Sequence, residues 1–591
     1  MPDRVSLASR AAMGALLAGA LATGASAAPR AHRHSHARSG APTQSERIAQ
    51  LAAAVQSLEA WRAQETAEEA TRQKAGAAKL QALRDELADA NARAARAEAQ
   101  ADSEIESIPA AADSAVEKRR PRNGVLDFKG VKVTLGGFAA AETVYRSKNE
   151  ESDVGSNFSK LPFANNAVGH TDEWRATARQ SRISFLAQGD IDPQTHAAFY
   201  GEFDFMGAGQ TANSNESNSY APRIRNLYGT VDWDRLGLHV LAGQSWSLLT
   251  LNNKGISPRN EVIPPTIEAQ YAPGFDWARQ PQIRVVKDFD KVVWLGLSVE
   301  NPQTTFGATP SGVSGLAPGV SVLTNGSGNT TINGGAATGP TASAEFDTAN
   351  TLSLNHVPDV IAKVAYEPRI GGAQPLHLEL VGLYREFEDR VTYTAANPFG
   401  FAPGVRNVDS TGWGVGGGFT WAAWPGRLDL EGSALTGAGI GRYGAGQLPD
   451  TYVAPTGVLT PIPETMFLGG ATLHATPKLD LYLFGGAELQ SRVDNLVFGG
   501  RAFGYGSPAA TLGGCLVEGA ACTPDLSSIW QVTVGLWDKA YAGDFGQVRV
   551  GLQYSHTVAT AFTGLSGVGG ASLTPSTAED MVFTSFRYYP F

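Results

Sequence analysis

The sequence is poor in charge, and after its first residues it lacks any apolar run long enough to cross a bilayer as a helix. Of its 591 residues 18% are charged, and the formal net charge is −10. This composition excludes a nucleic-acid-binding surface and an acidic disordered chain. Without a second apolar run of about 20 residues, the sequence does not predict a helical membrane protein.

Catalytic signatures are missing as well. The chain contains neither a G-x-S-x-G nucleophile elbow nor an H-E-x-x-H zinc motif. His239, His377, His474 and His556 lie in predicted strands, where isolated histidines are more often interfacial than catalytic. We therefore expect no enzyme, no metal and no cofactor. An outer-membrane hydrolase that uses these histidines as bases is the enzymatic alternative.

Cysteine is nearly absent, with Cys515 and Cys522 as the two examples. Nothing nearby supplies further metal ligands, so a metal site is not indicated. The pair fits a disulfide that closes one loop in an oxidising compartment. Two free thiols are the alternative.

The N-terminus predicts export. Arg4 and Arg10 accompany the short apolar run AAMGALLAGALATG, and the small residues Ala25–Ser26–Ala27 follow it. This arrangement is typical of a secretory signal peptide over residues 1–27. A basic, His-rich leader is expected over residues 28–45.

Residues 46–106 consist largely of the helix formers Ala, Glu, Gln, Arg and Leu. Apolar residues recur in this segment at spacings of three and four and form a seam along one side of the helix. A seam of this kind buries its apolar side chains against another helix, so we expect a parallel periplasmic coiled coil and self-association. A single solvated helix is the alternative. Prolines then break the helix in a linker over residues 107–125. The seam residues recur at spacings of three and four: Ile48, Leu51, Val55 and Leu58, then Leu80, Leu83, Leu87 and Ala90.

From residue 126 to 591 the apolar period changes to two. In HAAFYGEFDFMG, Phe199 and Phe203 fall on one face, and Glu202 and Asp204 on the other. Sixteen strands are predicted, although eighteen remain an alternative. Their ranges are 132–147, 179–192, 196–207, 223–234, 236–249, 280–290, 291–302, 357–368, 376–388, 411–424, 427–437, 464–475, 479–491, 527–538, 546–558 and 579–591.

Short turns and long loops alternate between these strands, which is typical of a bacterial outer-membrane barrel. The expected fold is an all-β transmembrane barrel of about 16 antiparallel strands, preceded in the sequence by an α-helical coiled-coil stalk. Charges on one strand face are tolerated in a wet lumen, whereas a soluble sandwich would have to pair them. Aromatic residues near strand ends, including Trp413 and Trp537, are expected at the membrane interfaces. In the last strand both registers contain aromatics, and we expect a bulge beside Tyr588 and Tyr589.

A barrel of this size leaves an aqueous channel. The third long loop, 250–277, is stiffened by prolines such as Pro264 and Pro265, and we expect it to fold inward as the constriction. An ordinary extracellular loop is the alternative. A longer loop, 303–356, is rich in Gly, Ser, Thr and Asn, has no Lys or Arg, and is expected at the surface, where it either remains free or covers the mouth.

Basic side chains on the early strands and on the loop 250–277 are the candidate anion-binding residues. Guanidinium groups bind carboxylates and phosphates in a bidentate manner. Alternatively, they are rim residues that bind lipid headgroups or pair with the lumen acids Glu202 and Asp204. The candidates at the constriction are Arg179, Arg182, Arg223, Arg225, Arg284, Lys254, Arg259 and Glu261.

Four segments resemble the DcaP-like trimeric porins: TARQSRISFLAQGDI, AAFYGEFDFMG, APRIRNLYGTVDWDRLGLHVLAGQSWSLL and NEVIPPTIEAQ. The resemblance implies a homotrimeric outer-membrane porin with a periplasmic stalk, surrounded by lipid and lipopolysaccharide. It also implies passive diffusion of small anionic solutes, including dicarboxylates, past Arg179, Arg182, Arg223 and Arg225. The stalk would lie within reach of peptidoglycan. A structural tether or adhesin that uses the stalk and the large surface loops is the alternative function.

Overall fold

The computed structural model of the protein describes residues 125–207, 221–307, 313–324, 352–370, 373–567 and 569–591. Toward the N-terminus it also describes Gln56, Ala63 and Gln81, whose backbone is helical. The expected signal peptide, the leader and helix pairing in the stalk lie outside the described residues. Among the described residues, no helix combines the length and apolarity needed to cross a membrane.

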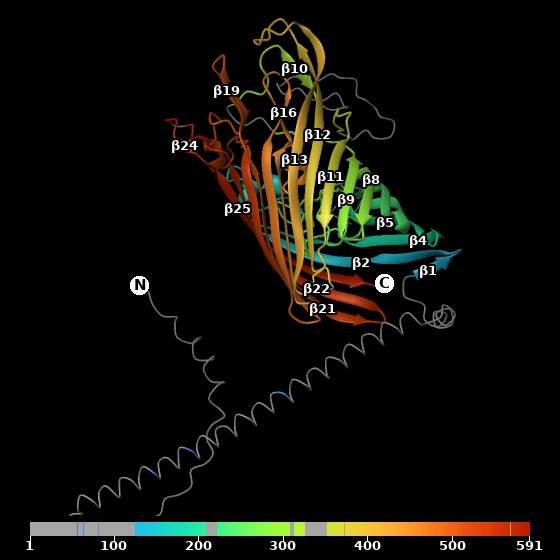
Figure 1. The fold of residues 1–591 in the computed structure, drawn as a ribbon. Helices are drawn as coiled ribbons and strands as arrows, with labels where there is room; N and C mark the ends of the chain where they lie inside the picture. The colour runs from blue at the N-terminus through green and yellow to red at the C-terminus, as the bar shows by residue number, and fades with distance from the viewer. Residues whose placement is uncertain are drawn as a thin grey trace, which may run out of the picture. The chain divides into compact units, whose positions relative to one another are not determined.

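Sixteen antiparallel strands close into a barrel (Figure 1), as the sequence predicts. Closure comes from β2 and β25, which pair from Ala139 with Tyr588 to Arg146 with Met581. In ring order the strands are β2 (Val131–Arg146), β4 (Arg182–Asp192), β5 (Thr195–Gly207), β6 (Ala221–Trp233), β7 (Leu238–Trp246), β8 (Arg279–Phe289), β9 (Val293–Glu300), β11 (Asp359–Tyr366), β12 (Leu376–Tyr393), β13 (Gly404–Trp424), β14 (Leu428–Ala438), β17 (Pro463–His474), β18 (Leu479–Gln490), β21 (Leu526–Gly543), β22 (Gly546–Ala561) and β25 (Ser576–Tyr589).

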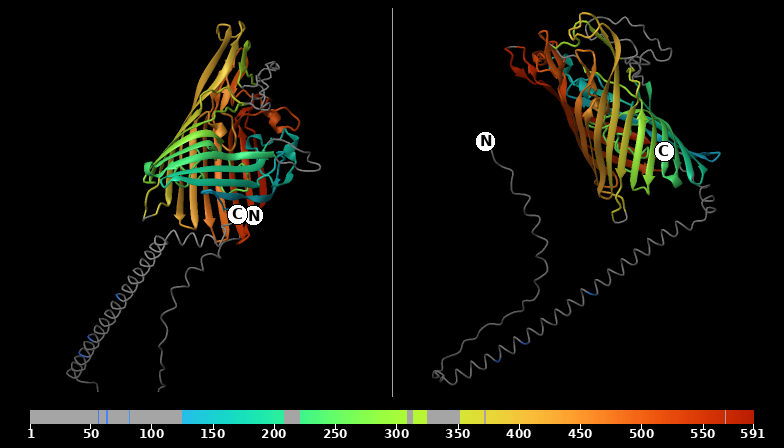
Figure 2. Two further views of the ribbon diagram at one scale, coloured as in Figure 1. Left: turned by 90° about the vertical axis from the view of Figure 1, so that its right-hand side faces the viewer. Right: turned by 45° about the horizontal axis from the view of Figure 1, so that its top comes forward.

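Shorter elements extend the barrel wall and its rims. β1 (Val125–Phe128) and β3 (Glu173–Thr177) pair with β2, and β10 (Val320–Leu323) pairs with β12. Three small hairpins are β15 (Thr451–Val453) with β16 (Leu459–Pro461), β19 (Val493–Phe498) with β20 (Arg501–Tyr505), and β23 (Gly564–Leu565) with β24 (Ser572–Leu573). The 3₁₀ helices are η2 (Phe158–Lys160), η3 (Ala167–His170), η4 (Asp234–Leu236), η5 (Gly441–Tyr443) and η6 (Gly513–Leu516). β12 and β13 reach beyond their neighbours at one end (Figure 2).

Alternation along each strand separates an apolar outer face from a polar inner face. On β12, Leu380 is 70% exposed, whereas its neighbours Glu379 and Val381 are 4% and 7% exposed. Large apolar side chains recur on the outer face of most other strands. A closed wall with this outer face suits a hydrocarbon surrounding, because its backbone hydrogen bonds are satisfied within the sheet.

Two expectations about aromatic residues are wrong. Trp537 is 6% exposed and points inward, where its indole Nε1 donates to the Pro265 carbonyl at 2.7 Å. β25 pairs continuously with β22 up to Tyr589, so the expected bulge is absent. The continuous register places Arg587 inside the barrel, where Glu142 balances its charge at 2.8 Å.

Candidate functional site

The segment between β7 and β8 lies inside the barrel. Its Ile267 amide donates to Gln553 Oε1 on β22 at 2.5 Å, and its Gly274 amide donates to Glu488 Oε1 on β18 at 2.8 Å. Because β18 and β22 are far from β7 and β8 in ring order, the segment crosses the lumen to reach them. We call residues 250–277 the inner loop.

Apolar side chains explain why the inner loop packs inward. Ile267 and Ala272 are fully buried, and Phe275 packs in the same cluster as Phe484 of β18. Gly274 has a φ of +87°, and a Cβ there would lie 2.0 Å from the Phe467 carbonyl oxygen. A glycine is therefore required where the loop approaches β17.

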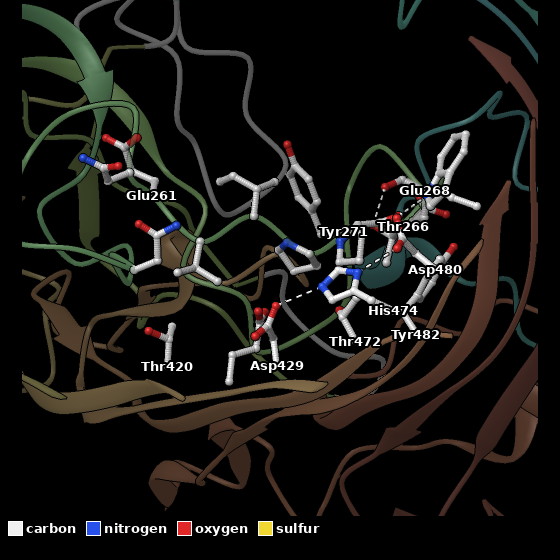
Figure 3. Close-up of a pocket in the computed structure, with 18 of the residues that line it drawn as sticks. Glu261, Thr266, Glu268, Tyr271, Thr420, Asp429, Thr472, His474, Asp480 and Tyr482 are labelled. Carbon is white, nitrogen blue, oxygen red and sulfur yellow. Dashed lines mark hydrogen bonds and ion pairs between the residues drawn. The ribbon is translucent and has the colours of Figure 1, made fainter. Parts of the chain in front are cut away.

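A cavity of about 860 Å³ remains beside the inner loop (Figure 3). The strands that contribute to it include β4, β6, β13, β14, β17, β18, β22 and β25. Both signs of charge line it in similar number, so it is a polar, ionic chamber. The basic lining residues are Arg182, Arg225, Lys254, Arg549 and Arg587, and the acidic ones are Asp204, Glu261, Glu268, Asp429, Glu431 and Asp480.

The structure brings part of the predicted site to this cavity. Arg259 and Glu202 instead line an adjoining hollow of about 230 Å³, which Arg182, Arg225 and Glu261 also line. The remaining three candidates line neither space, because each is engaged elsewhere in the wall. Arg179 pairs with Asp153, Arg223 pairs with Asp204, and Arg284 donates to the Trp246 carbonyl.

The arginines of the site differ in how strongly they are held. Arg225 pairs with Glu202 at 2.6 Å and with Asp204 at 3.0 Å, and it donates to the Tyr271 hydroxyl. Pairing with these acids was the alternative role that the sequence left open. Arg182 has one ion pair, to Glu202 at 3.6 Å, and its Nε has no hydrogen-bond partner among the described residues. Arg182 is thus the less committed guanidinium of the two.

Arg587 is a cavity residue that the sequence did not single out. Its guanidinium lies 4.9 Å from the Phe138 ring centroid, and that of Arg182 lies 5.2 Å from the same centroid. Arg587 also donates to Gln180 Oε1 at 3.0 Å. The available signal was the strict alternation of β25, which places Arg587 on the same face as Phe583 and Ser585.

The facing wall carries acids around a histidine. His474 on β17 contacts Asp480 of β18 at 2.7 Å and Asp429 of β14 at 3.0 Å (Figure 3). Glu431 follows Asp429 by two residues on β14, so it lies on the same face of the strand and lines the same cavity. The histidine therefore joins three neighbouring strands on the inner face.

Comparison with known proteins supports the fold. No protein-family model matches the sequence, and no curated protein does either. The crystal structure of the outer membrane channel DcaP of Acinetobacter baumannii is similar, with a TM-score of 0.50 and 18% identity over 78% of this chain and 99% of that chain. This chain has the fold of a porin. The expected resemblance to DcaP is confirmed at the level of the fold.

Two other porin structures are more distantly similar. The anion-selective porin from Comamonas acidovorans has a TM-score of 0.38 and is 11% identical over 78% of this chain and 99% of that chain. OprB of Pseudomonas putida at high pH has a TM-score of 0.39 and is 11% identical over 77% of this chain and 94% of that chain.

The inner loop of this porin fold carries two carboxyl groups with raised pKa values. Burial raises the pKa of Glu268 to about 7, although Arg146 and the Ser156 amide act in the opposite direction. Burial, followed by the charge of Glu488, raises the pKa of Asp276 to about 8. Both groups are therefore protonated to a large degree near neutral pH.

Other histidines of the barrel also contact carboxylates. His239 on β7 contacts Asp232 on β6 and Asp288 on β8. His196 on β5 contacts Asp190 on β4 and Asp234, which follows β6. Of the histidines considered as bases, His377 lies between Glu367 and Glu379, and His556 contacts Asp580. Each of these contacts links a histidine to a carboxylate within the barrel wall.

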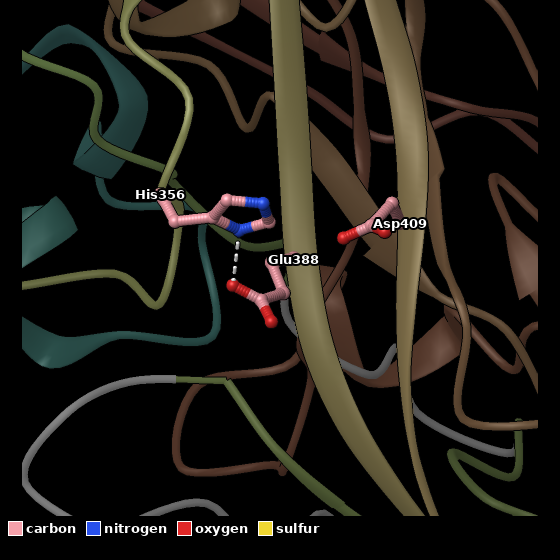
Figure 4. A group of neighbouring side chains, drawn as sticks. All are labelled: His356, Glu388 and Asp409. Atoms are coloured by element: carbon pink, nitrogen blue, oxygen red, sulfur yellow. Dashed lines mark hydrogen bonds and ion pairs between the residues drawn. The ribbon is translucent and has the colours of Figure 1, made fainter.

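Two further groups lie outside the lining of the main cavity. Cys515 and Cys522 form a disulfide at η6, in the connection between β20 and β21. His356, Glu388 and Asp409 place one potential metal-ligand atom each within 4.8 Å of one another (Figure 4). Glu388 and Asp409 are cross-strand partners on the outer face of β12 and β13. This group therefore does not belong to the lumen.

Proposed function

We propose that the protein is a passive diffusion channel of the bacterial outer membrane for small hydrophilic solutes that carry a carboxylate. One observation carries the proposal: a closed porin-fold barrel encloses an ionic cavity of about 860 Å³ beside an inner loop. Such a chamber is within the volume range of small-molecule sites. The exposed apolar outer face fits a surrounding of lipid and lipopolysaccharide.

A preference for anions follows from the basic side chains at the Arg182 wall of the cavity. Arg182 has a weak partner in Glu202, and it lies beside Arg225 and Arg587, which add to the positive potential. A carboxylate that reaches Arg182 gains charge-assisted hydrogen bonds without displacing a close ion pair. Arg182 is therefore the residue on which anion selectivity depends most.

The expected result in a planar lipid bilayer is a reversal potential that favours chloride over potassium under a salt gradient. Arg182→Gln should lower the chloride-to-potassium permeability ratio by about two- to threefold, because the lumen loses an under-neutralised charge. Arg501→Gln, at an exposed hairpin turn, makes the same change of charge outside the cavity and should leave the ratio unchanged. A silent barrel would contradict the channel, and a cation preference of the wild type would contradict the role of Arg182.

We further propose a homotrimer whose periplasmic stalk, residues 46–106, contributes to assembly near the peptidoglycan. The full-length protein is expected to show conductance steps in groups of three and a trimeric mass in detergent. Deletion of residues 46–106 should shift the mass toward smaller species, because the coiled-coil seam is lost. An unchanged oligomer mass after the deletion would show that the stalk does not set the assembly.

A further inference from the structure

The cavity has walls of opposite charge. Arg182 and Arg225 project from β4 and β6, whereas Asp429, Glu431 and Asp480 project from β14 and β18. In the ring of sixteen strands these two groups of strands are roughly half the circumference apart. Both walls line one continuous cavity, so a solute inside it meets positive charge on one side and negative charge on the other.

Glu431 is the distinctive residue of the acidic wall. Asp429 and Asp480 share His474, and Asp480 also pairs with Lys539 at 3.1 Å. Glu431 forms no hydrogen bond and no ion pair with the residues that the structure describes. Its charged neighbour is another acid, Asp429. Its carboxylate thus faces the cavity without a counter-charge from the wall.

On the wall formed by β4 and β6, one basic side chain lacks a full set of partners. Arg225 is saturated by Glu202 and Asp204, but the Nε of Arg182 is without a partner among the described residues. Lys254 of the inner loop and Arg549 of β22 line the same cavity, and no ion pair to a described carboxylate is found for either. Arg182 therefore has an unused donor on one wall, and Glu431 has no counter-charge on the opposite wall.

We propose that the preferred solutes of the channel are zwitterions that carry a carboxylate and an ammonium group several bonds apart. The carboxylate binds at the Arg182 wall and the ammonium at Glu431. This assignment rests on the proposed channel function and specifies its substrate class. The walls face each other across a cavity of about 860 Å³, so separated charges, as in an ω-amino acid or a short peptide, fit better than a compact α-amino acid.

A solute of this kind is favoured over an anion or a cation of equal length. A dianion gains at Arg182 but is repelled at Glu431, and a dication meets the reverse situation. Opposite charges at both ends avoid this repulsion. The wall charges therefore predict that the zwitterion permeates faster than both the dianion and the dication.

The test uses the full-length protein in liposomes and three labelled probes of equal chain length: ε-aminocaproate, adipate and hexamethylenediamine. Uptake of each is divided by the uptake of neutral arabinose by the same vesicles, which corrects for the amount of open channel. The wild type is expected to take up ε-aminocaproate about threefold faster than adipate, because one repulsive contact is replaced by an attractive one.

Glu431→Gln keeps the size of the side chain and removes its charge. It should lower the ratio of ε-aminocaproate to adipate uptake about threefold while arabinose uptake is maintained. Glu518→Gln, on an exposed loop, is the matched control and should leave the ratio unchanged. Arg182→Gln should slow both carboxylate-bearing probes relative to arabinose.

The outcomes separate this inference from the proposed channel function. Arabinose uptake with equal rates for the zwitterion and adipate, or a ratio insensitive to Glu431→Gln, would overturn the zwitterion assignment and leave the channel intact. Absence of uptake of every probe, arabinose included, by correctly inserted wild-type protein would overturn both. If Glu431→Gln inserts poorly, Glu431→Asp, which moves the charge but retains it, should give an intermediate ratio, and a wild-type ratio would count against the proposal.

Discussion

Replacement of residues 254–270 by a short glycine–serine linker is expected to raise the single-channel conductance about two- to threefold. These residues form most of the inner loop, whose contacts with β18 and β22 carry it across the lumen. Their removal widens the path for ions and eliminates the part of the cavity wall to which Glu261 and Glu268 contribute. The measurement is conductance in a planar bilayer at high salt, where surface charge contributes little.

A matched deletion distinguishes widening from general damage. Shortening of residues 395–403, the connection between β12 and β13, removes loop residues that do not line the cavity. Its conductance should equal that of the wild type. If the inner-loop replacement leaves the conductance unchanged while the barrel remains inserted and heat-stable, the inner loop is not the constriction.

Raising the pH from 6 to 9 is expected to loosen the inner loop. The pKa of Asp276 is raised to about 8 in the folded protein, so the folded state binds a proton that the unfolded chain releases near its ordinary carboxyl pKa. The free energy that stabilises the packed loop therefore decreases as the pH rises from the unfolded to the folded pKa. The decrease is up to about 1.4 kcal/mol per pH unit, and it levels off above the folded pKa. Glu268, with a pKa of about 7, acts in the same direction.

The groups around Asp276 determine the size of this effect. Glu488 of β18 and Glu379 of β12 disfavour its ionisation, and Lys363 of β11 favours it. Hydrogen–deuterium exchange of residues 250–277, corrected for the intrinsic pH dependence of exchange, should increase between pH 6 and 9. Asp276→Asn with Glu268→Gln should remove most of the increase, because both amides remain neutral. Equal protection of the wild-type loop at both pH values would refute the assignment.

The strand content of the barrel could be predicted from the sequence because a wall between two different media imposes an alternating pattern. In β12, for example, Leu378 and Leu380 alternate with His377 and Glu379, and this information is local. The inward packing of the inner loop was expected from its prolines and its position. Local pattern was thus sufficient for strands and for one loop.

Partnerships between side chains could not be predicted in the same way. Arg587 and Glu142 are 445 residues apart in sequence and meet because β25 and β2 close the ring. The same closure makes a charged residue acceptable in the last strand, which removes the need for the expected bulge. The partner of Trp537 is likewise distant in sequence, because its indole donates to Pro265 of the inner loop. Pairing depends on ring order and loop placement, which alternation does not encode.

The histidine contacts add side-chain links between neighbouring strands in part of the barrel wall. His196 joins β4, β5 and the end of β6, and His239 joins β6, β7 and β8, so histidine–aspartate contacts connect five consecutive strands. Both ring nitrogens of a histidine donate hydrogen bonds only in the imidazolium form. Each of these contacts is therefore complete when the histidine is protonated, and loss of that proton would remove one of its two side-chain links while the backbone ladders between the strands remain.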